Sequence, residues 1–422
     1  MLNKKFLVVA GVISLALMLL LLPLLSACGP KAQPGQKLKV GMMTPTTGPA
    51  AEKGAPMGHA NLDAIEYINT ELGGAGGYQI EAIWLDTNYD AAKVATITKR
   101  FMDENVLLFT VASSKEMSAA MEIANRAGLP GIASFTAPSL YRPPQHIYGQ
   151  MPDYGDDALA FVNYFMKNIW KGSGKPKFAL HILNNPTGYG AKDAFRAKAA
   201  ELGVEVISTD EHQATTTSEM ASLTRIKASK PDVLYVSSTP APTAVIIKNA
   251  RDLGLYPGIT IGLGHAGLTK ALVDIAGASA VEGVYGVFPT VNWDDKVPGM
   301  AKMTEYVKKL HPGDYQNMDY ITSWAQSLMV AEILKLAVKN AGYDTLAKGG
   351  ATAWKAVEEQ GIKKLKDYDV GGLHGPASYT PGDNRLSKSV RVFQIKGGAI
   401  QPVSGWVEAP MVKYEDFDWF GK

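Results

Sequence analysis

The chain has 422 residues, of which 46% are hydrophobic and 19% charged, so it has ample apolar material for two or more packed units. Its 42 Lys and Arg nearly balance its 40 Asp and Glu, and this small net charge argues against a nucleic-acid partner. Cys28 is the only cysteine, which excludes an internal disulfide and a cysteine-based metal site.

The N-terminus has the parts of a secretory signal peptide. Lys4 and Lys5 precede an apolar run over residues 6–25, and small residues then lead to Cys28. An uncleaved membrane helix is the alternative, because about 20 apolar residues can span a bilayer. Pro23, near the end of the run, favours cleavage instead.

The stretch "LSAC" at the end of this run resembles the lipobox of bacterial lipoproteins. The resemblance implies that residues 1–27 are removed and that a diacylglyceryl group is attached to the Cys28 sulfur. Residues 28–37 are rich in Pro, Gly, Lys and Gln and are expected to form a flexible tether. We therefore expect an extracytoplasmic protein held at the membrane by a lipid anchor.

Strand-like and helix-like segments alternate along the first two thirds of the remaining chain. Strands separated by single helices predict right-handed parallel βαβ units, with sheets covered on both faces. The predicted strands are residues 38–45, 78–87, 106–113, 177–183, 231–238, 259–264 and 282–289, and the predicted helices are 58–72, 91–105, 190–203 and 243–254.

The last third of the chain has a different pattern. Residues 319–342 predict a long helix that is apolar on much of its surface and is therefore buried between layers. Residues 375–381 and 389–400 are predicted as strands, with a tight turn at Gly397-Gly398. About 370 residues are too many for one sheet, so we expect an α/β fold with two doubly wound parallel-sheet lobes. Ligands of such sheets bind at the carboxyl ends of the strands.

Residues 262–267, "GLGHAG", match the dinucleotide pattern G-x-G-x-x-G and lie between a predicted strand and a predicted helix. The match lies deep in the chain rather than in a first βα unit, and an extracytoplasmic protein has little access to NAD. The seven histidines lack zinc-hydrolase spacing, and no nucleophile motif or carboxylate pair stands out. We expect no enzymatic activity, no catalytic residue, no cofactor and no metal.

Serine and threonine side chains follow two neighbouring predicted strands. Ser113 and Ser114 end one strand and begin a helix, where serine is a common N-cap. The same helix start, with its free N–H groups, can bind an anion such as a carboxylate. Ser134 and Thr136, in "ASFTAP", repeat the arrangement after the next strand. We expect these hydroxyls to converge on one ligand.

Several segments in order resemble the type I solute-binding proteins of bacterial ABC importers, in the leucine/isoleucine/valine-binding branch. They are "TGPAAEKGAPMGHANLDAIEYIN", "SSKEM", "FTAP", "NNPTGYGAKDAF", "KNARDLGL", "DIAGASAVEGVYG" and "GPASYTPGDNR". The resemblance covers nearly all of the chain after Cys28 and implies two lobes joined by three crossovers. It implies residues 38–150 with 289–385 in the N-terminal lobe, 151–288 with 386–407 in the C-terminal lobe, and a tail over 408–422.

The resemblance also implies binding roles for particular residues. Ser113 or Ser114 matches the serine that holds the ligand carboxylate, and Ser134 and Thr136 match contacts from the next strand. Tyr189 matches a tyrosine that reaches in from the second lobe.

Two further positions, Thr239 and Lys53, fall where relatives often carry an aromatic residue. His265 stands where amino-acid binders keep an acid for the ligand α-ammonium, and an imidazole does not supply that negative charge. A buried ammonium without a counter-charge is costly. We expect a small carboxylate ligand without an α-ammonium; the alternative is that Glu116 or Asp319 replaces the missing acid.

The predicted function is therefore the binding component of an ABC importer, a monomer that closes on its ligand and delivers it to permease subunits. Its ligand is a small carboxylate, either a branched-chain or hydrophobic amino acid or a related aromatic or aliphatic acid. An extracytoplasmic sensor of the same fold and a secreted hydrolase are the alternatives.

Overall fold

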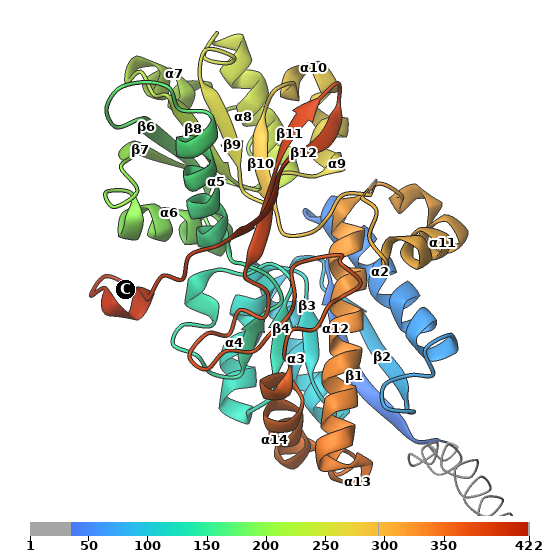
Figure 1. Cartoon of the computed structure of the whole chain (residues 1–422). Coiled ribbons are helices and arrows are strands. Elements are labelled where there is room, and N and C mark those ends of the chain that lie inside the picture. Colours follow the sequence, from blue (N-terminus) through green and yellow to red (C-terminus); the bar gives the residue numbers. More distant parts are fainter. Residues whose placement is uncertain (1–34, 294, 421–422) are drawn as a thin grey trace, which may run out of the picture.

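Two sheets, each at the centre of its own lobe, organise the chain (Figure 1). The computed structural model describes residues 35–293 and 295–420. The predicted signal peptide, the predicted lipidation site Cys28 and most of the predicted tether lie outside these residues. The predicted α/β fold with two lobes is confirmed.

The first lobe contains a parallel five-stranded sheet in the order β2-β1-β3-β4-β5. The inner strands β1, β3 and β4 are largely buried, as expected for a sheet covered on both faces, whereas the edge strand β2 is mostly half-buried. The strands are β1 (Lys37–Thr44), β2 (Gln79–Asp86), β3 (Phe109–Val111), β4 (Gly131–Ala133) and β5 (Ile147–Gly149), and the first helices are α2 (Ala51–Thr70), α3 (Ala91–Asp103) and α4 (Ser114–Ala127).

The second lobe contains a seven-stranded sheet in the order β12-β11-β10-β9-β8-β6-β7, in which β11 and β12 are antiparallel. Gly397 and Gly398 form the turn of the β11–β12 hairpin with φ values of +58° and +78°, as predicted. The strands are β6 (Lys177–Leu183), β7 (Glu205–His212), β8 (Val233–Ser237), β9 (Thr260–Leu263), β10 (Tyr285–Phe288), β11 (Ser389–Lys396) and β12 (Ala399–Glu408), and the helices are α5 (Tyr154–Asn168), α6 (Pro186–Lys198), α7 (Met220–Ala228), α8 (Pro240–Asp252), α9 (Lys270–Ala276) and α10 (Ala278–Val281).

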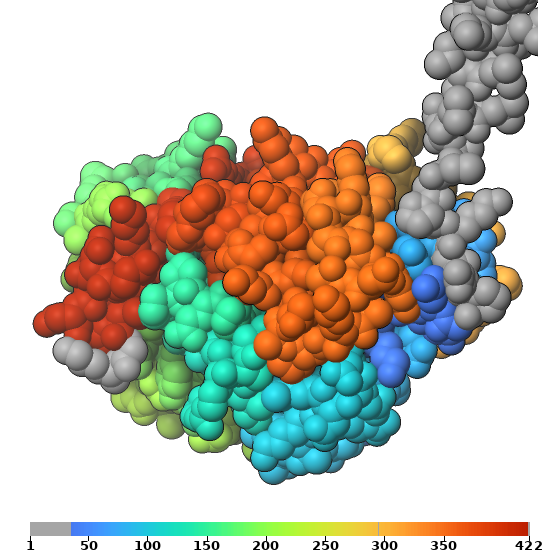
Figure 2. All heavy atoms as spheres, turned by 90° about the horizontal axis from the view of Figure 1, so that it is seen from below, coloured from blue at the N-terminus to red at the C-terminus, as the bar shows by residue number. Residues whose placement is uncertain are grey.

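The chain passes between the lobes three times, after β5, after β10 and before β11. Between the second and third crossovers the chain returns to the first lobe. Seen from below, this lobe therefore shows the orange residues of the returning segment beside the blue and cyan N-terminal residues (Figure 2). The helices of this segment are α11 (Met300–Leu310), α12 (Met318–Ala341), α13 (Tyr343–Leu346) and α14 (Gly350–Gln360).

Helix α12 is the core helix of the first lobe, as its sequence predicted. Among the described residues it is the one helix long and apolar enough to cross a membrane, but 78% of its most apolar window is buried in the fold. Trp324 and Ile333 on it are almost fully buried. Asp319, in its first turn, is also fully buried and pairs with Lys53 of α2 in the same lobe.

Three local predictions differ from the structure. Residues 375–381 form only isolated bridges, because Pro376 and Pro381 lack the N–H groups that a strand ladder needs. The edge strand β7 was not predicted, because most of its residues are polar and it has no apolar run that indicates a buried strand. Helix α2 begins at Ala51 rather than at residue 58: Gly54 allows close approach to the preceding loop, where an added Cβ would lie 2.1 Å from the Pro45 carbonyl oxygen.

A buried network of charges lies where the crossovers meet. Arg385 donates to Asp156 at 2.8 Å and to Asp383 at 3.0 Å, and Arg142 donates to Asp383 at 3.0 Å. Asp153 and Asp156 form a capping box at the start of α5. Side chains from three separate stretches of the chain thus hold the crossovers together.

Candidate ligand-binding cleft

A narrow cavity of about 30 Å³ lies between the lobes, at the carboxyl ends of strands from both sheets. The starts of helices α2, α4, α5, α6 and α8 surround it, so several helix N-termini with their partial positive charge lie near its wall. Its lining residues are Pro45, Ala50, Lys53, Gly54, Met57, Tyr89, Ala112, Ser113, Phe135, Tyr154, Thr187, Thr239 and Ala266. This is the position at which open α/β sheets bind ligands.

Of the two predicted serines, Ser113 lines this cavity, whereas Ser114 is buried beside it and is not one of the lining residues. Ser113 is the N-cap of α4, and Ser114 is the first residue of that helix. The Ser114 hydroxyl is fully buried and lies 3.3 Å from the Thr187 hydroxyl, which begins α6 in the other lobe. A hydroxyl and a helix N-terminus from each lobe therefore meet across the cleft.

Glu116 lies directly behind the serines. Its carboxylate accepts hydrogen bonds from Ser113, at 2.7 Å, and from Thr87. Burial raises the pKa of Glu116 to about 7, although both hydrogen bonds lower it. The charge of this carboxyl group therefore changes near neutral pH.

His265 lies between two aromatic rings from different lobes. Its ring centroid is 4.6 Å from that of Phe135 in the first lobe and 4.7 Å from that of Tyr154 in the second. Its Nδ1 lies 2.5 Å from the Asp157 Oδ2, which also accepts the His265 backbone N–H at 2.9 Å. The His265 and Asp157 side chains are both fully buried.

Lys53 and Asp319 form a second buried ion pair. The Lys53 Nζ lies 2.5 Å from the Asp319 Oδ1 and 4.7 Å from the centre of the Phe135 ring. Burial raises the pKa of Asp319, whereas the charges of Lys53 and His265 lower it. Asp319 was one of the two acids expected to take the place of the missing acid at position 265 as partner of a ligand ammonium. In the structure it is already paired with Lys53.

The structure places the other predicted site residues unevenly. Thr239 lines the cavity, and its side chain makes no capping hydrogen bond at the start of α8. Ser134 and Thr136 are buried on either side of the lining residue Phe135 but do not line the cavity themselves. Tyr189 lies outside it: 36% of the residue is exposed, and its hydroxyl donates to Glu211 at 3.4 Å.

Four residues at the cleft were not predicted from the sequence: Phe135, Tyr154 and Thr187, which line it, and Asp157, which contacts His265. Burial raises the pKa of Tyr154, while hydrogen bonds with Thr187 and Ser114 lower it. Tyr154 and Thr187 each begin a helix of the second lobe. Their position next to a helix N-cap is the sequence signal that could have identified them.

The "GLGHAG" segment runs from strand β9 into the loop before α9. It carries His265 and Ala266 into the cleft. An added Cβ at Gly262 would lie 2.3 Å from the Phe161 ring. Close packing against α5 is therefore the physical reason for glycine at position 262.

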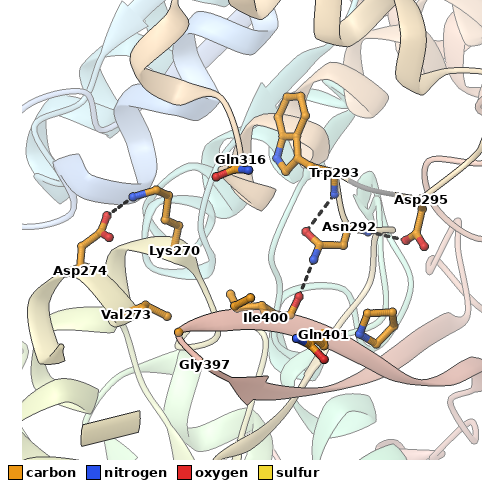
Figure 3. A pocket seen from close by; sticks show the side chains of 13 residues that line it. Lys270, Val273, Asp274, Asn292, Trp293, Asp295, Gln316, Gly397, Ile400 and Gln401 are labelled. Carbon is orange, nitrogen blue, oxygen red and sulfur yellow. Dashed lines mark hydrogen bonds and ion pairs between the residues drawn. The ribbon is translucent and has the colours of Figure 1, made fainter. Parts of the chain in front are cut away.

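A larger hollow lies on the side of the crossovers, between the β11–β12 hairpin and the loop after β10 (Figure 3). Lys270 pairs with Asp274 there, and Asn292 donates to the Ile400 carbonyl oxygen. None of the predicted site residues lines it. Within residues 35–293 and 295–420, no group of three or more His, Cys, Asp or Glu side chains is placed to hold a metal ion.

Two sheets that meet at their carboxyl ends around a small cleft, with three crossovers between the lobes, are typical of proteins that close around a small ligand. A family model described as "Periplasmic binding protein" matches residues 37–399, and the chain belongs to that family. The predicted resemblance to the type I solute-binding proteins of the hydrophobic amino acid family is confirmed.

Individual relatives differ in what they bind. "Leu/Ile/Val-binding protein homolog 7" of Brucella suis is 23% identical over 320 residues, which are 74% of this chain and 79% of the relative. A branched chain amino acid ABC transporter protein from Thermus thermophilus, with bound valine, has a TM-score of 0.78 and 19% identity over 90% of this chain and 98% of its own. A fatty acid ABC transporter substrate-binding protein from Thermomonospora curvata has a TM-score of 0.77 and 20% identity over 92% and 96%. These structures share the fold.

Proposed function

We propose that this protein is the solute-binding component of an ABC importer and captures a small carboxylate between its two lobes. The observation that carries the proposal is the meeting of hydroxyls and helix N-termini from both lobes, at Ser114 and Thr187, inside the cleft. Such groups suit a carboxylate, which accepts hydrogen bonds from N–H and O–H donors. Relatives named for branched-chain amino acid and fatty acid transport are both consistent with a carboxylate ligand.

The ligand would favour the closed arrangement, because it contacts both lobes only when they are together. The proposal can be tested with a thermal-shift panel of hydrophobic amino acids, aliphatic acids and aromatic acids. A bound ligand raises the melting temperature as its concentration exceeds Kd. We expect at least one carboxylate to stabilise the protein, and the neutral amide or alcohol analogue to have no effect. Stabilisation by the uncharged analogue alone would refute carboxylate capture.

We also propose that Cys28 carries the lipid that holds the protein at the membrane, which rests on "LSAC" after the apolar run. Replacing Cys28 with Ala is expected to remove the acceptor sulfur, so the protein is released or remains unprocessed. Membrane fractionation and N-terminal sequencing measure this. One acyl chain gives only marginal membrane affinity, so stable retention requires at least two. Normal processing with unchanged membrane retention in the Cys28→Ala variant would contradict the assignment.

Carboxylate binding is expected to weaken as the pH rises through about 7. Ionised Glu116 repels the ligand carboxylate. It also accepts the hydrogen bond of the Ser113 hydroxyl, so Ser113 is less available as a donor to the ligand. Between pH 6 and 8, Kd should rise by up to about tenfold per pH unit, the limit for one linked proton. The same raised pKa makes ionised Glu116 destabilise the fold, a loss that develops as pH rises from about 4.5 to 7.

Titration calorimetry at several pH values measures this dependence. Glu116→Gln should flatten it, because the amide does not ionise. Glu122→Gln is the matched control, since Glu122 lies on the same helix but is exposed and paired with Arg126. An unchanged pH dependence in Glu116→Gln would assign the titration to another group.

A further inference from the structure

Two acid–base pairs of side chains lie at the cleft. Lys53 and Asp319 come from the first lobe, and His265 and Asp157 come from the second. In each pair a side-chain nitrogen lies 2.5 Å from a carboxylate oxygen, and the four side chains are at most 9% exposed. The Phe135 ring lies 4.7 Å from the Lys53 Nζ and 4.6 Å from the His265 ring, so the two pairs are neighbours on either side of it.

The Lys53 ammonium has the surroundings that a bound amino acid would need for its own ammonium. One carboxylate oxygen of Asp319 lies against it, and the face of the Phe135 ring lies 4.7 Å away. A carboxylate and an aromatic face both attract a desolvated cation. The Lys53 side chain lines the cavity, so this ammonium is at the ligand's wall and not in a separate part of the lobe.

Two other acids behind the cleft wall, Asp157 and Glu116, accept hydrogen bonds from the protein. The Asp157 Oδ2 accepts the His265 backbone N–H and lies against the His265 ring. Glu116 accepts from Ser113 and Thr87. At Asp319, a ligand ammonium would therefore lie beside a second cation, the Lys53 ammonium.

We propose that Lys53 is the specificity-determining residue of the cleft: its own ammonium occupies the cation site made by Asp319 and Phe135, so that the protein selects carboxylic acids without an amino group. This inference rests on the proposed capture of a small carboxylate. It also assigns a role to the unpartnered Asp319 Oδ2, which is buried and has no hydrogen-bond partner among the described residues. When Lys53 loses its charge, both oxygens of Asp319 become available to a ligand ammonium.

The physical reason is the cost of unbalanced charge in a desolvated site. Two ammonium groups that share one carboxylate leave a net positive charge inside the closed cleft, which is unfavourable away from water. An acid that lacks the amino group brings only a carboxylate, which the serine end of the cleft can take. Asp319 then keeps Lys53 as its partner.

The experiment compares amino acids with their deaminated analogues by titration calorimetry. Suitable pairs are leucine with 4-methylpentanoate, valine with 3-methylbutanoate and phenylalanine with 3-phenylpropanoate. In the wild-type protein we expect the deaminated acid of the best-binding pair to bind about tenfold or more tightly than the amino acid. Lys53→Met keeps much of the side-chain volume, removes the ammonium and should shift this ratio toward the amino acid by about tenfold or more.

Three further variants isolate the cause. Lys53→Gln is a second neutral variant in case the methionine variant does not fold, and circular dichroism checks both. The double variant Lys53→Met with Asp319→Asn should lose the gain for amino acids, because the freed carboxylate is gone. Lys115→Met is the matched control: it removes a lysine near the cleft that donates to the Tyr89 carbonyl oxygen and is not paired with Asp319.

A wild-type protein that binds the amino acid as tightly as its deaminated analogue would overturn the inference while leaving carboxylate capture intact. An unchanged ratio in both neutral variants, or an equal shift in Lys115→Met, would also overturn it. If no member of any pair binds, carboxylate capture itself is refuted, and this inference falls with it.

Discussion

Replacing Arg385 with Met is expected to lower the free energy of unfolding by about 3–5 kcal/mol, the usual loss when one partner of a buried ion pair is removed. Arg385 donates to Asp156 and Asp383 at 2.8–3.0 Å, and all three side chains are at most 3% exposed. Without the guanidinium, two carboxyl groups remain buried beside each other. Arg142 still pairs with Asp383 but does not reach Asp156 in this structure.

The loss should also depend on pH. Burial raises the pKa of Asp156 to about 7, with a further rise from Asp153, while Arg385 lowers it. Burial also raises the pKa of Asp383, but hydrogen bonds from Arg385 outweigh this and hold it below its usual value. In Arg385→Met both native-state pKa values rise, so the native state binds more protons. Its stability is then best at low pH and falls as the pH rises, and the destabilisation should be greater at pH 8 than at pH 5.

Urea unfolding at pH 5 and pH 8 measures both effects. Lys388→Met is the control, because Lys388 lies 3.7 Å from Asp383 and 28% of its side chain is exposed. A partly exposed pair of this kind contributes about 1 kcal/mol or less. Equal losses in the two variants would show that the Arg385 network does not hold the crossovers together.

Replacing Ser114 with Ala is expected to weaken binding of the carboxylate ligand by about 1.5–3 kcal/mol, roughly ten- to over a hundredfold in Kd. The Ser114 hydroxyl is fully buried and lies opposite Thr187 of the other lobe. Alanine removes a hydrogen bond to the charged ligand and also this contact across the closed cleft. Both losses act in the same direction, because each belongs to the closed, ligand-bound arrangement.

Titration calorimetry with the acid identified by the thermal-shift panel measures the change. Ser118→Ala is the matched control, since Ser118 lies one turn later on α4 and donates to the Ser114 carbonyl oxygen at 3.0 Å. It removes a hydroxyl from the same helix without reaching the cavity. Wild-type affinity in Ser114→Ala would move the carboxylate site away from the start of α4.

Local patterns in the chain were enough for much of the architecture. Residues 177–183 form β6 as predicted, since an apolar run of that length suits a strand covered on both faces. The helix predicted over residues 319–342 is α12, because an apolar surface all round requires burial. Ser113 was recognised because N-cap chemistry involves only residues within one turn.

Local sequence patterns could not predict which distant side chains pair with each other. Lys53 is separated by 266 positions from Asp319, and His265 by 108 positions from Asp157. A lysine or histidine has the same local pattern whether it faces solvent, a ligand or an internal carboxylate. The resemblance to amino-acid binders therefore raised the question of a missing acid at position 265. The buried partners of Lys53 and His265 became visible only in the tertiary structure, where each pair lies within one lobe.

Periodicity, turn residues and helix caps act over a few neighbouring residues, so the order of strands and helices and the hydroxyls at their ends follow from the amino-acid sequence. The balance of charge at the cleft depends on which distant residues the fold packs against one another. Burial then strengthens the electrostatic interaction within each pair. Those are properties of packing over long separations. They place Lys53 against Asp319 and leave Tyr189, which the family resemblance had assigned to the cleft, on the surface beside Glu211.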